Sequence, residues 1–262
     1  MSNAQTPARG WALILGASTG FGAECGIALA GAGYDICGVH LDRKAGMALA
    51  DETRGKIEAT GKRALFFNVN AADAENRKQV IDALIAEKAK VGVLMHSLAF
   101  GALKPFIAED HITQVQMDMT LSVMAHSLVY WTQDLVLQGL MGKGGRIFSM
   151  TSSGSTRAIF SYGAVSAAKC ALESHTRQLA YELAPQGIAV NAIRAGVTIT
   201  AASSKIPGSD KLFEGALAKN PGKRLTTTAD VAGAMVALCD PAAGWLTGNV
   251  INVDGGEEIS IG

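Results

Sequence analysis

The sequence predicts an α/β fold in which residues 1–262 form a single domain. We expect one doubly wound, mostly parallel sheet of about seven strands with helices on both faces. Short apolar runs, typical of buried strands, alternate with longer helical segments along the chain. Three glycines follow the first apolar run directly, where a strand would turn into a helix. A hydrophobic content of 48% over 262 residues can fill the core of one large domain.

Each predicted strand is a short, mainly apolar run. In chain order, these runs are 11–15, 33–41, 63–69, 91–97, 145–150, 188–193 and 249–253. The longer segments between them predict helices, from one rich in small apolar residues after the first strand to a polar one after the third. The predicted helices are 20–32, 45–60, 74–90, 115–140 and 162–184. Strands that alternate with helices form βαβ units, which place parallel strands in one sheet.

One irregular stretch, 198–223, separates the last two predicted strands and contains two Pro-Gly pairs, at 207–208 and 221–222. An insertion of this kind is often a mobile lid over a binding site. We therefore predict a substrate-binding lid here. A surface excursion without a role in the site is the alternative.

The composition argues against nucleic-acid and membrane partners. With 23 basic and 23 acidic residues the formal net charge is zero, so the chain has no basic footprint for an anionic partner. No run of about 18 apolar residues free of charge is present, and no membrane span is expected. Residues 1–7 lack the basic-then-apolar pattern of a signal peptide. These observations predict a soluble, cytoplasmic protein.

The cysteines and histidines do not predict a metal site or a disulfide framework. The cysteines are scattered, with no CxxC pair, and the histidines have no ligand spacing to one another. We expect reduced thiols and no bound metal. The residues considered are Cys25, Cys37, Cys170, Cys239, His96, His111, His126 and His175.

Gly16, Gly20 and Gly22 form a Gly-x3-Gly-x-Gly pattern between the first strand and the first helix. Glycine permits a tight turn and lets backbone N–H groups approach a pyrophosphate. The start of the helix adds a partial positive charge to those donors. The pattern predicts a dinucleotide site in a turn that also contains Ser18, Thr19 and Phe21. Glycines that serve only close helix packing are the alternative.

This glycine pattern resembles the TGxxxGxG motif of the short-chain dehydrogenase/reductase superfamily, with Leu15 where threonine is usual. The resemblance covers essentially the whole chain, down to residues 247–256. It implies a Rossmann-like sheet, a nicotinamide cofactor and usually a homotetramer. It also implies cofactor contacts after later strands: Asn68 and Val69 at the adenine, and Ser97, Leu98, Ala99, Lys169, Gly196, Thr198 and Thr200 elsewhere.

The end of the second strand bears on the choice between NADPH and NADH. A carboxylate there would bind the ribose 2′-hydroxyl, whereas an arginine would favour a 2′-phosphate. His40 stands where NAD-preferring relatives usually carry the acid, and Asp42, Arg43 and Lys44 follow. Arg43 and Lys44 favour NADPH over NADH. These charges could also be ordinary solvated turn residues.

The superfamily's usual catalytic Tyr-x3-Lys element is absent, because Val165 precedes Lys169 by four residues. Tyr162 instead precedes Lys169 by seven, giving Tyr-x6-Lys. Seven residues return to nearly the same helical face, about 10 Å along the axis instead of about 6 Å. The tyrosine is thus predicted one turn farther from the lysine on the cofactor side.

This shift has a chemical interpretation. Ketone reduction delivers hydride to the carbon that carries the oxygen, so the proton donor must lie close to it. Reduction of an α,β-unsaturated thioester delivers hydride to Cβ, and charge develops on an oxygen two bonds farther away. A phenol withdrawn from the lysine could stabilise that charge. Lys169 would bind the nicotinamide ribose and, as a cation, favour ionisation of Tyr162.

Tyr-x6-Lys resembles the enoyl-[acyl-carrier-protein] reductases of this superfamily, and so do segments 96–100 (HSLAF), 156–162 and 193–203. Ser122 stands where standard superfamily members carry a catalytic asparagine. Ser152 stands where ketone-reducing relatives keep a catalytic serine. The divergent NADPH-using branch of enoyl reductases also shows serine there, so Ser152 fits that branch. Val197, where proline is common, is a further departure.

The resemblance implies reduction of the C=C bond of a trans-2-enoyl thioester in fatty acid biosynthesis. The thioester would be carried on acyl carrier protein or coenzyme A. A 3-oxoacyl or other ketone reductase is the alternative, against which Val165 argues. A non-catalytic cofactor sensor is a third possibility, against which the retained Tyr162 and Lys169 argue. The acyl chain length and the carrier stay open.

Two further features concern packing. Cys170 should face about 100° away from the cofactor side of its helix, and we expect it to be a small buried residue. Trp131 and Tyr130 lie on the helix 115–140, which in this superfamily pairs with the catalytic helix across subunits. They are expected either at a subunit interface or in the core.

Overall fold

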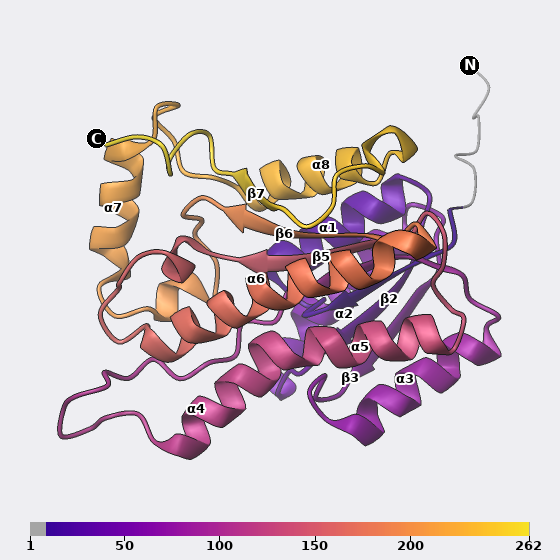
Figure 1. Cartoon of the computed structure of the whole chain (residues 1–262), viewed down its shortest axis with the longest axis horizontal. Coiled ribbons are helices and arrows are strands. Elements are labelled where there is room, and N and C mark those ends of the chain that lie inside the picture. The colour runs from indigo at the N-terminus through magenta and orange to yellow at the C-terminus, as the bar shows by residue number, and fades with distance from the viewer. Residues whose placement is uncertain (1–8, 262) are drawn as a thin grey trace.

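The computed structural model describes residues 9–261 and contains one sheet of seven parallel strands (Figure 1). The strands are β1 (Trp11–Leu15), β2 (Asp35–His40), β3 (Ala64–Asn68), β4 (Val91–His96), β5 (Arg146–Thr151), β6 (Ala189–Ala195) and β7 (Val250–Val253). They lie in the order β3-β2-β1-β4-β5-β6-β7. The chain therefore winds outward from β1 in both directions, and the predicted fold class is confirmed.

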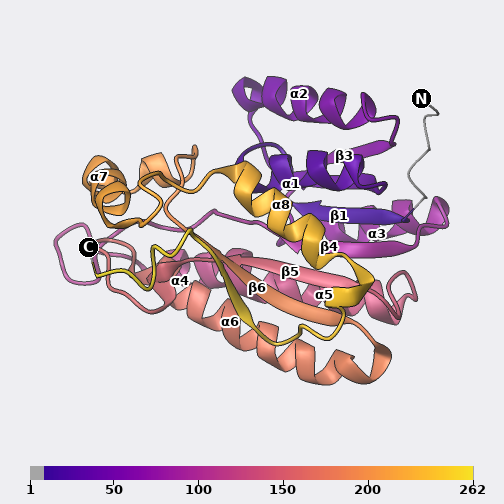
Figure 2. The same cartoon turned by 90° about the horizontal axis from the view of Figure 1, so that it is seen from above.

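Eight α-helices connect the strands of the described chain. They are α1 (Gly20–Gly31), α2 (Met47–Glu58), α3 (Ala74–Ala86), α4 (Gln114–Leu121), α5 (Ser127–Leu137), α6 (Gly163–Leu183), α7 (Ser209–Lys219) and α8 (Thr228–Leu238). Seen from above, α1, α2 and α8 cover one face of the sheet, and α4, α5 and α6 cover the other (Figure 2). Helix α3 packs on α5 on this second face.

Both faces of the sheet are buried, which explains the continuous apolar strands. In β1, Leu13 and Leu15 join the core beneath α3, α5 and α6, whereas Ala12 and Ile14 join the core beneath α1, α2 and α8. All five residues of this strand are buried. A strand covered on both sides gains from apolar residues at every position, not only at alternate ones.

The predicted helix 115–140 is interrupted. Residues Ser122–His126 form a π-helical turn between α4 and α5. A π-turn inserts one residue into the hydrogen-bond ladder and is frequent at functional sites. Here it directs Val123 and Met124 toward the two cavities described below.

Helices α7 and α8 were not predicted from the sequence. Helix α7 lies within the predicted lid and α8 follows it. Helix α8 begins with a capping box, in which Thr227 accepts from the backbone of Asp230 and the Asp230 side chain accepts from the backbone of Thr227. The Thr-x-x-Asp pattern before an apolar segment is a recognisable signal for a helix start.

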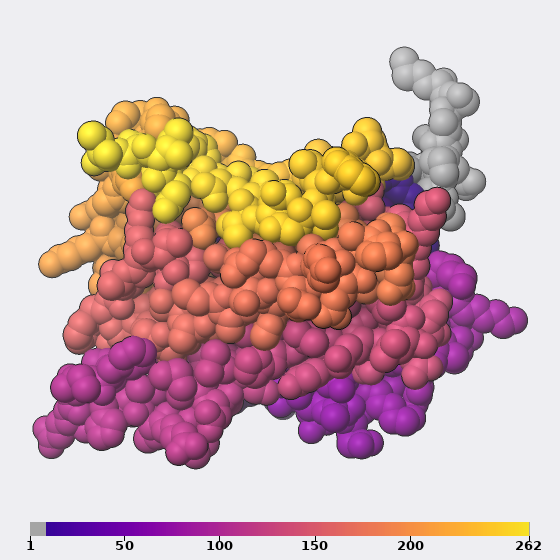
Figure 3. All heavy atoms as spheres, viewed as in Figure 1, coloured from indigo at the N-terminus to yellow at the C-terminus, as the bar shows by residue number. Residues whose placement is uncertain are grey.

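Helices α4, α5 and α6 form much of the face turned toward the viewer in Figure 3, and we call their part of it the open face. Trp131 points inward from α5, is fully buried, and donates from Nε1 to the Ala71 carbonyl at 2.8 Å. Tyr130 is 42% exposed on the same helix. Trp131 is therefore a core residue, and only Tyr130 is available to a neighbouring subunit.

One expectation about packing is wrong. Cys170 is exposed, and its Sγ donates to the Ser155 carbonyl at 3.1 Å. The turn away from the cofactor side of α6 takes this residue to the protein surface and not into the core. All four cysteines are free.

Over residues 9–261, no group of three or more histidine, cysteine or acidic side chains could hold a metal ion. Within the same residues, no helix has the length and apolar character needed to cross a bilayer.

Candidate active site

Two adjoining cavities open at the carboxyl ends of the strands. The first, of about 330 Å³, lies beside the glycine turn, and the second, of about 340 Å³, contains the predicted catalytic residues. Phe21, Leu98 and Thr200 are among the residues that line both. An extended ligand could therefore run from the glycine turn into the second cavity. This arrangement fits a dinucleotide whose nicotinamide end reaches the catalytic residues.

The glycine turn depends on the absence of side chains. Gly16 has φ +90°, and a Cβ on it would stand 2.4 Å from the Ser97 carbonyl oxygen. A Cβ on Gly22 would stand 2.0 Å from the Gly16 carbonyl oxygen. Thr19 precedes α1 without a side-chain cap bond, so the first N–H groups of the helix stay available to an anion.

Most of the predicted cofactor residues line these cavities. Gly16, Ser18, Thr19, Gly20, Phe21, Val69, Ser97, Leu98, Ala99 and Thr200 line the first. Lys169, Gly196 and Thr198 line the second. Three predicted cofactor residues line neither cavity, for a different reason in each case. They are Gly22, Arg43 and Asn68.

Gly22 lies beneath the turn, where its close approach to Gly16 shapes the backbone. Arg43 is exposed on the loop after β2. The adenine contact of Asn68 stays a prediction, and its amide group already has partners within the protein. Its Oδ1 accepts from the Asp42 amide at 2.9 Å, and its Nδ2 donates to the Asp42 carbonyl at 2.9 Å. Both ends of the amide thus hold the loop after β2.

Sequence reasoning missed part of the first cavity. Its wall also contains Leu41 and the residues after Val69, namely Asn70 and Ala71. Asn70 and Ala71 follow β3 directly, as Val69 does. Their position directly after a parallel strand could have predicted them as cavity residues, because such residues gather at the ligand-binding edge of the sheet.

Tyr162 lies at the start of α6 as its N-cap residue, not within the helix. Its hydroxyl is 3.4 Å from the Ser152 hydroxyl, so the two predicted residues do come together. The ring packs over Gly154, where a Cβ would stand 2.5 Å from Tyr162 Cε1. Ser161 has φ +60°, a conformation that a non-glycine residue rarely adopts. Such backbone strain is found preferentially at functional sites.

Lys169 is buried on α6 and donates from Nζ to the Met150 carbonyl at 2.6 Å. Burial lowers the pKa of Lys169 to about 8, and the negative charge of Glu173, one turn along α6, opposes that shift. The ammonium is thus held in a low-dielectric setting at the end of β5.

The phenol of Tyr162 differs from the expectation. Burial raises its pKa above the ordinary tyrosine value, and the hydrogen bond with Ser152 opposes the rise. Burial thus shifts the pKa of the phenol in the direction opposite to the expected ionisation by Lys169. A phenol that keeps its proton is suited to donate a hydrogen bond.

His96, in the segment that resembles HSxxF, is fully buried at the end of β4. Its Nε2 lies 2.8 Å from the Ser127 hydroxyl, which donates to the Val123 carbonyl. Burial lowers the pKa of His96 to about 3, and the charge of Lys169 acts in the same direction. The imidazole is therefore neutral and braces the π-turn. Ser122, at the start of that turn, lines neither cavity.

The segment 198–223 contributes to the wall of the second cavity. Ala202, Ile206 and Leu212 line it with apolar side chains. Helix α7 and the turn Ser203–Lys205 shape this segment. It is consequently placed over the site, where a lid would lie. Val197, where proline is common, donates its N–H to the Glu257 carboxylate at 3.0 Å.

Fold and site together define a nicotinamide-dependent oxidoreductase of the short-chain dehydrogenase/reductase superfamily. Within it, the chain belongs to the family described as "Enoyl-(Acyl carrier protein) reductase", whose profile matches residues 16–258. The family name covers related enzymes of different activities, as individual relatives show.

The chain is 29% identical over 250 residues to a 1-cyclohexenylcarbonyl-CoA reductase of Streptomyces collinus, covering 94% of this chain and 86% of the relative. It is also 29% identical to a 2-dehydro-3-deoxy-D-gluconate 5-dehydrogenase of Dickeya dadantii, covering 94% of both. The structure of an enoyl-[acyl-carrier-protein] reductase (NADH) from Aquifex aeolicus superposes with a TM-score of 0.84 at 25% identity, covering 96% of this chain and 97% of the other. The named enoyl-type reductase and the named dehydrogenase are thus equally similar in sequence to this chain.

The glycine turn yields a matched pair of variants. Gly22→Ala should lower cofactor affinity at least about tenfold, because the new methyl group would displace the Gly16 carbonyl and open the turn. Gly31→Ala, on the same helix, has no atom within 4 Å of the new Cβ and should bind cofactor normally. Fluorescence titration with NADPH and NADH measures both. Equal affinity of the two variants would contradict the assigned role of the turn.

Proposed function

We propose that this protein reduces the C=C bond of a trans-2-enoyl thioester with NAD(P)H, as an enoyl reductase of fatty acid biosynthesis. The observation that carries the proposal is the placement of Tyr162. Its protonated hydroxyl lies beside the Ser152 hydroxyl in an apolar cavity, seven residues before the buried Lys169.

The proposed roles of the residues follow from where charge develops. The cofactor, when bound, supplies hydride to Cβ of the substrate. Tyr162 would donate a hydrogen bond to the thioester oxygen, on which negative charge grows, and the enolate so formed would take up a proton from solvent at Cα to give the saturated thioester. Ser152 supplies a second donor close to the same oxygen. Lys169 binds the nicotinamide ribose and adds a positive charge at the end of β5.

The wall of the second cavity supports an acyl substrate. Leu98, Leu103, Met124, Val165 and Leu212 line it with apolar side chains. These residues offer an apolar surface to an acyl chain, and the same cavity is also lined by polar side chains, among them Ser153, Thr198 and Lys205. We assign the segment 198–223 as the lid over this cavity, and either acyl carrier protein or coenzyme A as the carrier.

The same geometry favours a second candidate, reduction of a 3-oxoacyl or other ketone. The 3.4 Å between the Ser152 and Tyr162 hydroxyls allows both to donate to one ketone oxygen. The relative from Dickeya dadantii is named as a dehydrogenase, which agrees with such chemistry. The absence of tyrosine at position 165 is the argument for ranking it second.

For assembly and location we propose a cytoplasmic homotetramer. The open face of α4, α5 and α6 is the surface through which subunits would pair (Figure 3). Exposed Tyr130 and Leu137 on α5 supply apolar contacts for this pairing.

Substrate class is tested by turnover. With NADPH, purified protein should oxidise cofactor in the presence of crotonyl-coenzyme A and not of acetoacetyl-coenzyme A. Tyr162→Phe should lower kcat at least about a hundredfold while cofactor affinity stays unchanged, because only the charge-stabilising hydroxyl is removed. Turnover of the keto substrate alone would overturn the proposal. Full activity of Tyr162→Phe would remove its proposed role.

The pH dependence follows from the two pKa shifts. The kcat/KM should fall as pH rises through about 8, since Lys169 loses its charge there while Tyr162 stays protonated. The slope should approach about tenfold per pH unit if the charge is essential. A plateau that continues to pH 9.5 would show that the lysine charge is not required.

For the cofactor we propose a preference for NADPH over NADH. The Asp42 carboxylate is held by His40 Nδ1 at 2.9 Å, so one of its oxygens already has a partner within the protein. Arg43 and Lys44 follow on the exposed loop. Arg43→Gln should weaken NADPH about tenfold and leave NADH unchanged, as titration of both cofactors would measure. Equal weakening of both would contradict the preference.

A further inference from the structure

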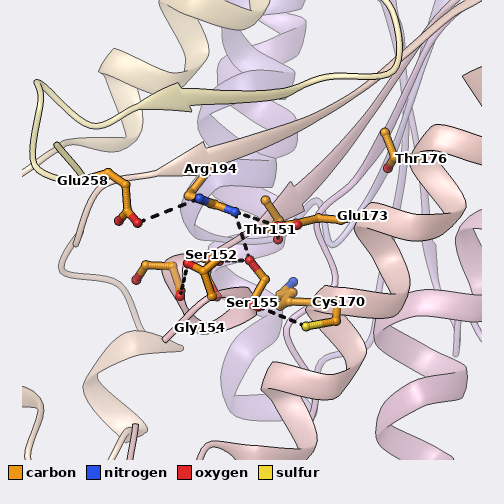
Figure 4. Close-up of polar contacts among 12 residues, drawn as sticks. Thr151, Ser152, Gly154, Ser155, Cys170, Glu173, Thr176, Arg194 and Glu258 are labelled. Atoms are coloured by element: carbon orange, nitrogen blue, oxygen red, sulfur yellow. Dashed lines mark hydrogen bonds and ion pairs between the residues drawn. The ribbon is translucent and has the colours of Figure 1, made fainter. Parts of the chain in front are cut away.

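Behind the catalytic cavity lies a cluster of polar side chains that the proposed reaction does not use (Figure 4). Its centre is Arg194, near the end of β6. One guanidinium nitrogen, Nη2, donates to Glu173 Oε1 at 3.1 Å and to Ser155 Oγ at 3.0 Å. Thr151 donates to the same Glu173 oxygen at 2.6 Å. Glu258, from the end of the chain, lies 4.0 Å from Nη1.

The ion pair at the centre is largely buried. The Arg194 side chain is 12% exposed and that of Glu173 is 11% exposed. Removing two such charges from water costs several kcal/mol per ion, and a pair of this kind often contributes little to stability. Arg194 Nε is also buried without a hydrogen-bond partner among the described residues. Stability alone therefore does not account for the pair.

Arg194 reaches the catalytic residues through the Ser155 side chain, whereas Thr151, also in the cluster, directly precedes Ser152 in the chain. Ser155 Oγ accepts from Arg194 and donates to the Ser152 carbonyl at 3.0 Å. Ser155 belongs to the turn Ser153–Ser155, and Ser152 immediately precedes it. A single hydroxyl thus transmits the position of the arginine to the residue whose own hydroxyl meets Tyr162.

Arg194, where this path begins, is held both by the sheet and by α6. Arg194 pairs with Thr151 in the register of β5 and β6, and Glu173 lies one turn after Lys169 on α6. The strand and the helix therefore fix the guanidinium relative to Lys169. The turn 152–155 leaves the sheet after Thr151, and α6 holds its backbone, because Ser166 Oγ donates to the Gly154 carbonyl at 2.5 Å and Cys170 Sγ to the Ser155 carbonyl at 3.1 Å. Arg194 adds the contact that holds the Ser155 side chain.

We propose that Arg194 is a positioning residue for the Ser152–Tyr162 hydroxyl pair and that it acts through Ser155. This inference rests on the proposed function in one respect, that Ser152 and Tyr162 bind the substrate oxygen. Arg194 itself touches neither substrate nor cofactor. Its role is to hold the turn so that the two hydroxyls converge on one oxygen.

The experiment measures kcat and KM with the substrate that the wild type turns over, and separately the affinity for the cofactor. Ser155→Ala removes the connection and leaves the ion pair, so kcat should fall about ten- to a hundredfold with unchanged cofactor affinity. Arg194→Met should lower kcat to the same extent. The double variant should be no worse than either single one, because both changes break the same path.

Two controls separate positioning from general destabilisation. Cys170→Ala removes a contact to the carbonyl of Ser155 but not to its hydroxyl, and should retain wild-type kcat. In a Ser152→Ala background, Ser155→Ala should have no further effect on kcat, because the group to be positioned is gone. A purely structural role would lower kcat in that background too.

Failure of the positioning role and failure of the proposed function give different results. If Tyr162→Phe abolishes activity while Ser155→Ala keeps full kcat, the positioning role is overturned and the proposed function stands. If Tyr162→Phe is fully active, the proposed function fails on its own. Should Arg194→Met not fold, the Ser155→Ala result and its cycle with Ser152→Ala decide the question alone.

Discussion

The parallel pairing of all seven strands is the constraint on which the rest of the structure depends. Since the strands run the same way, their carboxyl ends meet at one edge of the sheet. The register sets Leu15 beside His96, and Thr151 beside Arg194. The residues that follow these ends become the glycine turn and the turn at Ser152. Apolar cores on both faces hold this register, because a slipped strand would lose its packing on each side.

Within that edge, the site is organised by removal of charges from water. Lys169 is buried against a carbonyl, His96 is held neutral, and Tyr162 retains its proton. Arg194 and Glu173 are buried together behind them. Each of these groups is costly to bury, and each has a hydrogen-bond partner: the Met150 carbonyl for Lys169, Ser127 for His96, Ser152 for Tyr162, and Glu173 for Arg194. The resulting cavity presents neutral donors and the side chains of Lys169 and Lys205 to a substrate, which suits chemistry in which an oxygen gains negative charge.

Sequence reasoning recovered the strands and the residues that follow them, because apolar runs and glycine turns are local features. It missed α8, although the Thr227/Asp230 capping box was legible. It did not predict that the Asn68 amide holds Asp42, which lies 26 residues away in the sequence. It also misjudged Cys170, since a helix face turned away from the cofactor can lie at the surface as well as in the core.

The sequence by itself determined the doubly wound fold, the glycine turn and the seven-residue interval between Tyr162 and Lys169. Each of these is encoded by residues close together in the chain, through backbone conformation and helical repeat. Only the tertiary structure decided that Tyr162 caps α6 beside Ser152, that burial keeps its phenol protonated, and that Arg194 reaches Ser152 through Ser155. These features depend on contacts between β5, β6 and α6, which packing brings together from distant parts of the sequence.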